Sequence, residues 1–576
     1  RSIAEREGYQ MLRIWAQDFI TRIFPTTRVP EFPEKEAFMR SAKNEVACFQ
    51  IGVTAPSRDL NNLKVETADL VSESGRIITK DDIDVLYTGY VPVHWHSAWN
   101  DPDDLEGTAP GFYPDPLFPS LWRGVDRAAF PNVISLWIRI NVNESISAGN
   151  YKGNIKISCS AGEDSIKVEL QVLSFALSKR SHFLMTNWFL TGPIMKFHKL
   201  EPLTERFWQV IDRYAKNLAD HRQNVVLTPL FCMKNMPNLI DGRIQGQLVD
   251  ILETESDKYS FDFHNLDRWI DMFFGHNFEV IEGSHLAGGS IHPVGAMIRK
   301  QGQESAEYKG FESTMDNNYR GFIQQYLVAL RKYLSDKGWL GRFYLHLSDE
   351  PHGEQFEPYT SLAKFVKGLV PEIPLMDAMG SGEYAPFVDH PVPLENVYEA
   401  FVKCSGIPQE QIWFYYCCGP GGPYPNRFID YPLIRVRIFT WLAFKYGVPG
   451  FLHWGLNHWD WHPPFYIEHT YNPYDNTTGG SLQAGDSYVI YPPLMPSKSD
   501  DPVDSIRWEI IRKAMEDYEY LYMLRKIADD GDDQAKHLFD RINESITPDF
   551  REYTRNHHYL EDVKTQAGQI IANHQT

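Results

Sequence analysis

The stretch Arg342-Phe-Tyr-Leu-His-Leu-Ser-Asp-Glu-Pro-His-Gly353 decides the fold, because a short strand in it runs directly into two adjacent carboxylates. Apolar and polar residues alternate over 343–347, which is the two-residue period of a strand with one buried face. Pro351 lacks a backbone donor, so we expect the strand to end at Asp349 and Glu350. In parallel α/β folds, ligands bind at this edge of the sheet.

The two acids also have a purely structural interpretation. Ser348-Asp-Glu-Pro351 is a good helix start, in which a side-chain oxygen caps the helix ahead of a first-turn proline. The preceding sequence favours the strand, because an amphipathic helix is predicted from Tyr319 to Leu334, capped by Asp316 or Asn317 and ended by Gly338. A helix followed by an apolar strand is typical of a parallel sheet, so we expect the acids at a strand end.

The composition excludes several classes of partner. The chain has 576 residues and a formal net charge of -20, which gives no general attraction for nucleic acid or anionic membranes. It has no run of about 18 apolar residues, so no membrane span is expected. Aromatic residues make up 14% of the chain, and they suit either a large core or flat surfaces that bind sugar rings.

Motifs for metals and cofactors are weak. The six cysteines have no metal-ligand spacing, and adjacent Cys417 and Cys418 cannot easily bridge to each other, so we interpret the cysteines as buried thiols. His94 and His96 could share a strand face as metal ligands, but no third ligand stands at a telling distance. Gly419-Pro-Gly-Gly422 lacks the lysine of a phosphate loop. We expect neither a metal nor a cofactor.

The first third of the chain reads as a run of strands. With no helix between them, they predict an antiparallel β-sandwich, and their ranges are 46–53, 63–70, 83–93, 134–142, 151–158 and 166–175. A Pro- and aromatic-rich insertion from His94 to Pro119 is too long for a plain connection. We expect it to pack against a second domain.

After His182, strands alternate with helices. Eight strands at this chain length indicate a closed (β/α)8 TIM-type barrel. Their predicted ranges are 183–189, 225–230, 278–284, 343–347, 373–376, 386–392, 412–416 and 450–454. Helices are expected at 204–220, 266–274 and 432–446, and the strand-like residues 486–492 are assigned to a hairpin in the last loop.

The predicted fold class is therefore multidomain α and β, with a β-sandwich at 1–180, a (β/α)8 barrel at 181–500 and a C-terminal helical segment at 501–576 packed on the barrel. A helix capped near Asp504 and Ser505 is expected to close the barrel. The polar tail beyond residue 529 is expected to be peripheral.

Candidate site residues come from the carboxyl ends of the predicted strands. Asp349 and Glu350 are the candidate catalytic pair. A lone histidine is more often structural, and one or two of the tryptophans could serve packing alone. The side chains expected to bind substrate are Trp188, His285, Tyr415, Tyr416, Trp454, Asn457 and Trp459.

Two neighbouring carboxylates favour one kind of glycoside chemistry. A retaining glycosidase usually holds its two acids ~5 to 5.5 Å apart across the sugar, and an inverting one ~6.5 to 9.5 Å. Adjacent α-carbons are only ~3.8 Å apart, so this pair cannot easily flank a ring. Glu350 can instead protonate the leaving oxygen, while Asp349 holds the N–H of a 2-acetamido group whose carbonyl attacks the anomeric carbon. The close like charges would also raise the pKa of one acid, as a general acid requires.

Five segments in order along the chain together resemble glycoside hydrolase family 123. They are Gly111-Phe-Tyr-Pro-Asp-Pro-Leu117, Ala148-Gly-Asn-Tyr-Lys-Gly153, Ser348-Asp-Glu-Pro351, Gly485-Asp-Ser-Tyr-Val-Ile-Tyr-Pro492 and Ser505-Ile-Arg-Trp-Glu-Ile-Ile-Arg-Lys-Ala-Met-Glu-Asp-Tyr-Glu-Tyr-Leu521. The resemblance implies a β-N-acetylgalactosaminidase with a sandwich before a barrel. It also implies substrate-assisted retention through an oxazolinium-type intermediate, with Asp349 orienting the acetamido group and Glu350 as acid/base. Ser487 stands where family members often have Gly.

The leading hypothesis is an exo-acting enzyme that removes terminal β-linked N-acetylgalactosamine from oligosaccharides or glycosphingolipids. The alternatives are a non-catalytic glycan-binding surface protein, or a related hydrolase that acts on β-GlcNAc or within a chain. The resemblance implies bacterial secretion to the periplasm or cell surface, and we expect a signal segment ahead of Arg1 to have been removed. Nothing in the sequence fixes the oligomeric state.

Overall fold

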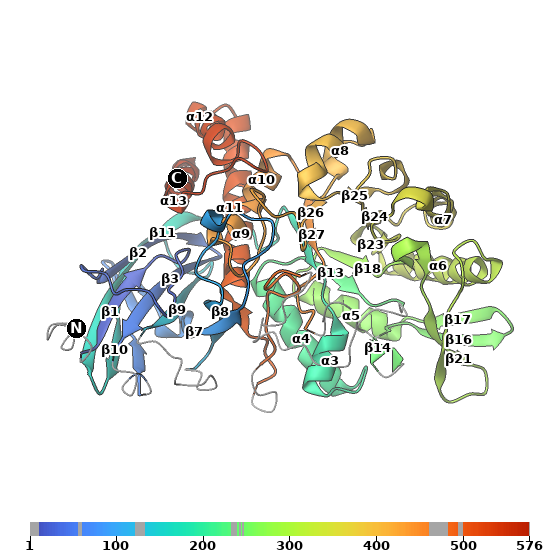
Figure 1. Ribbon diagram of the computed structural model, residues 1–576, viewed down its shortest axis with the longest axis horizontal. Helices are drawn as coiled ribbons and strands as arrows, with labels where there is room; N and C mark the ends of the chain where they lie inside the picture. The colour runs from blue at the N-terminus through green and yellow to red at the C-terminus, as the bar shows by residue number, and fades with distance from the viewer. Residues whose placement is uncertain are drawn as a thin grey trace.

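A computed structural model describes residues 11–55, 60, 62–120, 133–231, 239–240, 243–244, 247–459, 482–493 and 499–574. The N-terminal sheets lie on one side of the molecule and a set of parallel strands with helices lies on the other (Figure 1). The C-terminal helices stand between and above the two parts. The protein is thus a mixed α and β chain with a sheet-rich N-terminal region and a helical C-terminal part.

Two six-stranded sheets build the N-terminal region. Their facing sides are lined by alternating buried residues such as Ile51, Leu136 and Ile155, which form one hydrophobic core. The first sheet has the order β1 (Arg13–Gln17), β3 (Glu45–Thr54), β9 (Val133–Val142), β7 (Ile83–Val93), β8 (Gly111–Phe118) and β28 (Asp504–Ser505). The second has the order β2 (Glu36–Lys43), β11 (Gly162–Ala176), β10 (Gly149–Cys159), β5 (Leu70–Ser72) and β6 (Ile77–Ile78), with β4 (Lys64–Thr67) also on β10.

All the predicted strands of this region are present. We expected a purely antiparallel sandwich, but one pair of strands is parallel. Strand β2 pairs with β11 in parallel, with Met39 opposite Leu170. The reason lies at Asn44, where a left-handed backbone (φ 59°) carries the chain from β2 in one sheet to β3 in the other. The sequence also missed β1, β2 and β8. Strand β8 was missed because Pro114 and Pro116 lack backbone donors, and prolines are rare inside strands.

The insertion after β7 packs against the second half of the chain, as predicted. The hydroxyl of Ser97 donates to Asp430 over 2.6 Å, and its backbone N–H donates to the same carboxylate over 2.7 Å. The backbone N–H of Ala98 donates to Gln483 over 2.9 Å. His96 also lies 3.3 Å from Asp430.

Eight parallel strands lie where the sequence predicted strands. Five form one sheet in the order β13 (Val225–Thr228), β18 (Val280–Gly283), β23 (Phe343–His346), β24 (Leu375–Ala378) and β25 (His390–Val392). Three form another in the order β12 (Leu184–Asn187), β27 (Gly450–His453) and β26 (Phe414–Tyr415).

The two parallel sheets meet at both margins. Between β25 and β26 the contact is made by backbone bonds, from the N–H of Trp413 to Pro391 O (3.0 Å) and from that of Tyr415 to Pro393 O (3.1 Å). Between β12 and β13 a side chain replaces the backbone: Asn224 accepts from the N–H of Met185 and donates to Phe183 O, each over 2.9 Å.

The helices that follow these strands largely match the predicted ones. Thr204 caps α4 and Asp316 caps α6, and Gly338 ends α6 in a left-handed conformation. The helix predicted at 432–446 is divided in two at Ile438. The helices of this part are α3 (Thr191–His198), α4 (Glu205–Asp220), α5 (His264–Gly275), α6 (Asn317–Lys337), α7 (Phe356–Leu369), α8 (Tyr398–Ser405), α9 (Leu433–Arg437) and α10 (Phe439–Lys445).

Loops between the parallel strands carry a small extra sheet that the sequence did not predict. It has the order β17 (Lys258–Asp262), β16 (Asp250–Glu255), β21 (Ala296–Lys300) and β22 (Ala306–Lys309). It stands at the edge of the molecule far from the sandwich (Figure 1). None of the helices among the described residues has the length and apolar character needed to cross a membrane.

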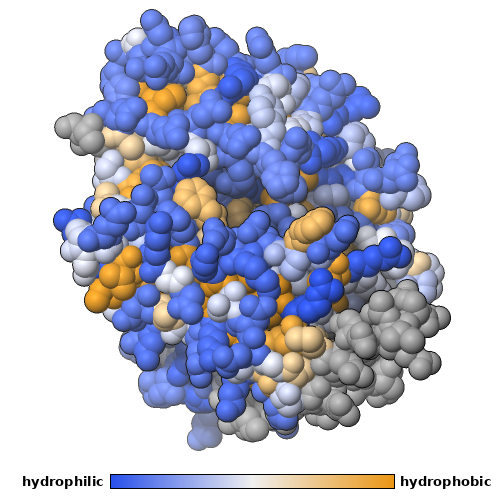
Figure 2. All heavy atoms as spheres, turned by 90° about the vertical axis from the view of Figure 1, so that its left-hand side faces the viewer, coloured by the Kyte–Doolittle hydropathy of each residue, from blue (hydrophilic) through white to orange (hydrophobic). Residues whose placement is uncertain are grey.

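The C-terminal helices are α11 (Ile506–Asp529), α12 (Asp533–Arg541) and α13 (His557–His574), with a π-helical turn at Ile542–Ile546. The tail beyond residue 529 is not peripheral, as we had expected, because α13 buries a stripe of Leu560, Val563, Ala567 and Ile571. The helix α13 packs on α11 and on β11 of the sandwich. The face made by the sandwich and these helices is mostly hydrophilic, with apolar side chains in small separate groups (Figure 2).

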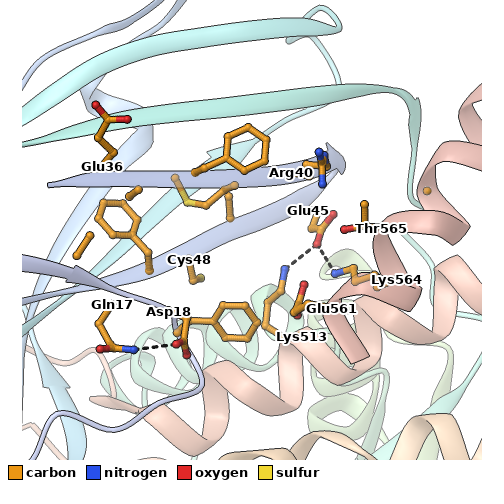
Figure 3. A pocket seen from close by; sticks show the side chains of 18 of the residues that line it. Gln17, Asp18, Glu36, Arg40, Glu45, Cys48, Lys513, Glu561, Lys564 and Thr565 are labelled. Atoms are coloured by element: carbon orange, nitrogen blue, oxygen red, sulfur yellow. Dashed lines mark hydrogen bonds and ion pairs between the residues drawn. The ribbon is translucent and has the colours of Figure 1, made fainter. Parts of the chain in front are cut away.

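A buried set of charges ties the C-terminal helices to the sandwich. Lys513 of α11 and Lys564 of α13 each place Nζ 2.7 Å from Oε1 of Glu45, which begins β3 (Figure 3). Lys564 also lies 3.0 Å from Asp517, and Arg437 of α9 lies 2.6 Å from the same carboxylate. We call these five residues the Glu45 cluster. It borders a cavity of about 400 Å³ between β1, β2, β3, α11 and α13.

Candidate active site

The two acids predicted as the catalytic pair lie just beyond the end of β23, where the chain is held against the neighbouring strand. The N–H of Ser348 donates to Oδ2 of Asp377 over 3.1 Å, and the N–H of Glu350 donates to Ala378 O over 3.0 Å. The next helical turn begins only after His352, and α7 begins at Phe356. The acids therefore do not cap a helix, and the structural alternative raised by the sequence does not apply.

Glu350 stands at the mouth of the site in an unusual backbone conformation. Its φ of 46° is uncommon for a residue with a side chain and costs of order 1 kcal/mol. The carboxylate accepts a hydrogen bond from the hydroxyl of Tyr415, at the end of β26. Burial, followed by the nearby Glu350 charge, raises the pKa of Tyr415 far above its ordinary value. The tyrosine thus stays a proton donor that fixes the orientation of the Glu350 side chain.

A hollow of about 310 Å³ opens beside Glu350 and Tyr415, and its volume is within the usual range for small-ligand sites. Glu350 and Tyr415 line one part of it. The loops that follow β23 and β24 supply the rest, including Pro351, His352, Ser381, Glu383 and Tyr384.

Asp349 lies deeper than Glu350 and has the electrostatics of a functional acid. Burial raises its pKa to about 6, and the adjacent Glu350 charge acts in the same direction. Below it, Asp377 of β24 is fully buried, and its pKa is raised well above the ordinary value, first by burial and then by Asp349. Three carboxylates therefore meet at this strand edge, and the opposing effect of His346 on the pKa of Asp349 is smaller than the effect of burial.

A second cluster of polar side chains lies near the carboxyl ends of β12, β18 and β23. Glu282, fully buried on β18, accepts hydrogen bonds from Thr186 (2.5 Å) and from the indole of Trp188 (2.8 Å). Its Oε1 also contacts Nε2 of His346. The ring of His346 in turn stacks on His285 with centroids 4.3 Å apart. This network fixes His346, which precedes Asp349 by three residues and interacts with it electrostatically.

Family models match most of the chain. The description "Glycoside hydrolase 123, catalytic domain" matches residues 188–524, and "Glycoside hydrolase 123 N-terminal domain" matches residues 32–159. The chain belongs to glycoside hydrolase family 123. It is therefore a glycosidase by family, and its sandwich and parallel-strand regions correspond to the family's two matched parts.

A solved structure of a family 123 enzyme has the same fold. This family 123 chain is similar to a family 123 glycoside hydrolase from Clostridium perfringens, described in a study of glycolipid glycan hydrolysis, with a TM-score of 0.72 and 14% identity over 98% of this chain and 97% of that one. A β-galactosidase from Bacillus circulans sp. alkalophilus (TM-score 0.34, 8% identity, 60% and 57% covered) and an endo-β-1,4-mannanase from Thermotoga petrophila (0.32, 11%, 59% and 77%) are too distant to carry an argument. No curated protein matches in sequence.

The residues predicted to bind substrate fall into two groups in this family 123 chain. Tyr415 borders the hollow, whereas Trp188 and His285 are buried, do not line it, and meet edge to face with ring centroids 5.0 Å apart. Burial, with His346 second, lowers the pKa of His285 well below its ordinary value, so this imidazole is neutral. Trp454, at the end of β27, is partly buried and stacks its ring with His453 at 6.4 Å.

The other predicted binding residues serve packing. The amide of Asn457 bonds the backbone of Leu190 in both directions, over 2.9 and 2.8 Å. The indole of Trp459 donates to Ile490 O over 2.9 Å, and its ring packs against Phe197. Tyr416 is fully buried. These three side chains support the loops around the site, and any contact they make with substrate stays a prediction.

A buried arginine that we did not predict connects the ends of β12 and β27. Arg427 donates to Asn187 (2.5 Å) at the end of β12 and to Nδ1 of His453 (2.6 Å) at the end of β27. Burial lowers its pKa to about 9. Asp486 lies 3.4 Å from the other nitrogen of His453, and burial raises the pKa of that acid to about 8.

Glu282, His346 and Asp377 were missed as well, although a signal was present. Each is a polar residue near the end of a short, otherwise apolar strand, as in Val280-Ile-Glu-Gly283 and Leu375-Met-Asp-Ala378. A buried charge at such a position needs a partner or a function. That pattern could have added all three residues to the predicted site.

One group of possible metal ligands occurs among the described residues, away from this site. His221, Asp504 and Glu509 bring ligand atoms within 4.8 Å of one another. Arg139 lies 2.9 Å from Asp504 and 3.1 Å from Glu509, and Arg512 also pairs with Glu509. Because two guanidinium groups already neutralise these acids, the group fits an ion-pair network and not a metal centre.

Proposed function

We propose that this family 123 enzyme is an exo-acting, retaining β-N-acetylgalactosaminidase that uses the substrate's own 2-acetamido group as nucleophile. The observation that carries the proposal is that Asp349 and Glu350 are adjacent just beyond the end of β23, with Glu350 lining the hollow and Asp349 more buried behind it. Adjacent α-carbons are ~3.8 Å apart, so the two acids are poorly placed to flank a sugar ring as acid and nucleophile.

The two acids divide the work. Glu350, oriented by Tyr415 in the hollow, donates its proton to the leaving glycosidic oxygen. Asp349 in its ionised form accepts the N–H of the acetamido group, and the acetamido carbonyl oxygen attacks the anomeric carbon as the glycosidic bond breaks. Glu350 then takes a proton from a water that opens the cyclic intermediate, so the β configuration is retained. With a pKa of about 6 for Asp349, we expect kcat/KM to fall on the acid side as pH drops through about 6.

The scaffold proposed for this chemistry is a closed (β/α)8 barrel. Support comes from the eight parallel strands and from the contacts at both margins of the two sheets, through Tyr415 on one side and Asn224 on the other. In such a barrel, catalytic side chains stand at the carboxyl ends of the strands, which is where the two acids lie.

The proposed substrates are oligosaccharides or glycosphingolipids that end in β-linked N-acetylgalactosamine. The similarity to the Clostridium perfringens enzyme, which was studied for glycolipid glycan hydrolysis, supports a glycolipid glycan as the physiological target. We further propose that the enzyme acts in the periplasm or at the cell surface, where such glycans are met.

An aryl β-N-acetylgalactosaminide provides the test. We expect turnover by the wild type, and a loss of about 10²–10⁴-fold in kcat/KM for Glu350→Gln, which removes the general acid. Asp349→Asn should lose a similar factor. Glu357→Gln, an exposed Glu in the first turn of α7, is the matched control and should keep full activity.

Two results would count against the proposal. Near wild-type turnover in both acid variants would show that the pair is not catalytic. A preference for aryl β-GlcNAc, or cleavage only within longer chains, would contradict the proposed specificity but not the proposed mechanism. Binding of a GalNAc-derived thiazoline separates the mechanisms, because a cyclised acetamido mimic should inhibit strongly only if the acetamido route is used.

A further inference from the structure

Two adjacent cysteines follow the strand that carries Tyr415. The sulfur atoms of Cys417 and Cys418 lie 3.7 Å apart, and both side chains are partly buried. By contrast, Cys404 is an exposed single thiol, so the prediction of buried thiols is wrong for that residue. Thiols in mutual contact are positioned to react with each other.

We propose that Cys417 and Cys418 form a reversible redox site, which closes to a vicinal disulfide by exchange with a small-molecule disulfide and thereby lowers the activity of the neighbouring acid pair. The reaction consumes one external disulfide. The thiolate of Cys418 attacks one of its sulfur atoms and releases one thiol. Cys417 then loses its proton, attacks the mixed disulfide at Cys418 and releases the second thiol. Two protein thiols are oxidised, and one disulfide is reduced to two thiols.

Cys418 suits the role of attacking group. The hydrogen bond from Cys417 lowers the pKa of Cys418, whereas burial and the Glu350 charge oppose this. The pKa of Cys417 is raised, so the two thiols differ in the way that an attacking and a resolving cysteine differ. The charged groups that face Cys418 are Glu350 and, across the loop, Asp486.

The bridge would be strained, and strain makes it reversible. Adjacent α-carbons are ~3.8 Å apart, whereas ordinary disulfides span ~4.4–6.8 Å. For this reason the sequence analysis did not predict such a bridge. Strained bridges are easily reduced and belong to the regulatory class of disulfides, not the structural one.

Closure reaches the active site through the backbone. The sulfur atoms must approach from 3.7 Å to about 2.05 Å. Buried Asn426 holds both Cys417 and the turn after the pair, because it donates to Cys417 O over 2.9 Å and to Pro420 O over 3.3 Å. The pair cannot close without displacing this anchored segment, and Cys417 lies two residues from Tyr415 and its bond to Glu350, so we expect the displacement to reach that bond.

The test uses the reduced full-length chain and oxidised glutathione. We expect the protein to lose the mass of two hydrogen atoms, with the bridge mapped to a peptide containing Cys417 and Cys418. Hydrolysis of whichever aryl glycoside the enzyme accepts should fall about tenfold or more, since small misplacements at an active site cost up to ~10²-fold, and dithiothreitol should restore it.

Cys417→Ser and Cys404→Ser provide the controls. Cys417→Ser should carry glutathione as a mixed disulfide at Cys418 in place of the internal bridge, and Cys404→Ser should respond as the wild type does. The proposal is overturned if the mass loss at 417–418 never occurs, or if it occurs without a change in rate. The mass measurement needs no substrate, so it remains informative even if the proposed specificity is wrong.

Discussion

Buried acids occur in two regions of this molecule, and their surroundings are opposite. In the Glu45 cluster each carboxylate touches cations: burial alone would raise the pKa of Glu45, but Lys513 and Lys564 hold it well below its ordinary value. At the end of β23 burial and the adjacent Glu350 charge raise the pKa of Asp349 to about 6, and the opposing effect of His346 is smaller. Both arrangements cost desolvation, but only the second leaves a proton that can move near neutral pH. The comparison distinguishes acids that hold the fold from the acid pair that we propose to be catalytic.

The largest expected effect comes from breaking the paired region. Glu45→Gln leaves two buried ammonium groups facing a neutral amide, and we expect the free energy of unfolding to fall by about 3–5 kcal/mol at pH 7. Because the pKa of Glu45 is depressed in the folded state, its contribution is present above about pH 4.5 and is lost as pH falls. Denaturant unfolding of the wild type and the variant at pH 7 measures the loss in unfolding free energy, and the same comparison below pH 4 shows whether the difference shrinks.

The matched control for that variant is Glu36→Gln. Glu36 pairs with Lys167 over 2.7 Å at the surface, where both side chains are well exposed. This change should leave the unfolding free energy nearly unchanged at both pH values. An equal loss in the two variants would contradict the special role of the buried cluster.

At the active site the same kind of substitution should stabilise the protein. The folded pKa of Asp349 is raised, so folding is favoured below the ordinary value near 3.8 and is penalised as pH rises through about 6. Asp349→Asn removes that penalty. We expect a gain of about 2–3 kcal/mol at pH 8, since one pKa unit is worth ~1.4 kcal/mol, and no gain at pH 3.5. Thermal unfolding at the two pH values checks this, and a lower midpoint at pH 8 would refute it.

The smallest effect concerns the orientation of Glu350. Tyr415→Phe removes the hydroxyl that donates to this carboxylate, and we expect kcat/KM to fall about tenfold, as for the loss of one hydrogen bond to a charged group. The control is Tyr446→Phe, because the Tyr446 hydroxyl makes the same kind of bond to Glu399 at the surface. Equal activity in the two variants would show that Tyr415 does not orient the acid.

Local patterns were sufficient to predict the eight parallel strands and the acid pair. Alternation over 343–347 located β23, and Pro351 marked the place where the strand gives way to the two acids. The unpredicted features depend on distant partners. Glu45 meets Lys513 across 468 residues of sequence, and no local period reports such a contact. Asp377 fell just outside the strand predicted at 373–376, and its importance comes from Asp349, beyond the end of the next strand.

Ser505 takes part in two secondary-structure elements, strand β28 and the N-terminus of α11. Its backbone lies in β28 opposite Pro116 of β8, and its hydroxyl caps α11 by accepting the N–H of Trp508 over 3.0 Å. A fragment cut to residues 188–524 would therefore keep this serine but lose the strand beside it, leaving the start of α11 without its neighbour. The two halves are poor candidates for separate expression or for exchange between enzymes, and engineering of this protein should treat them as one unit.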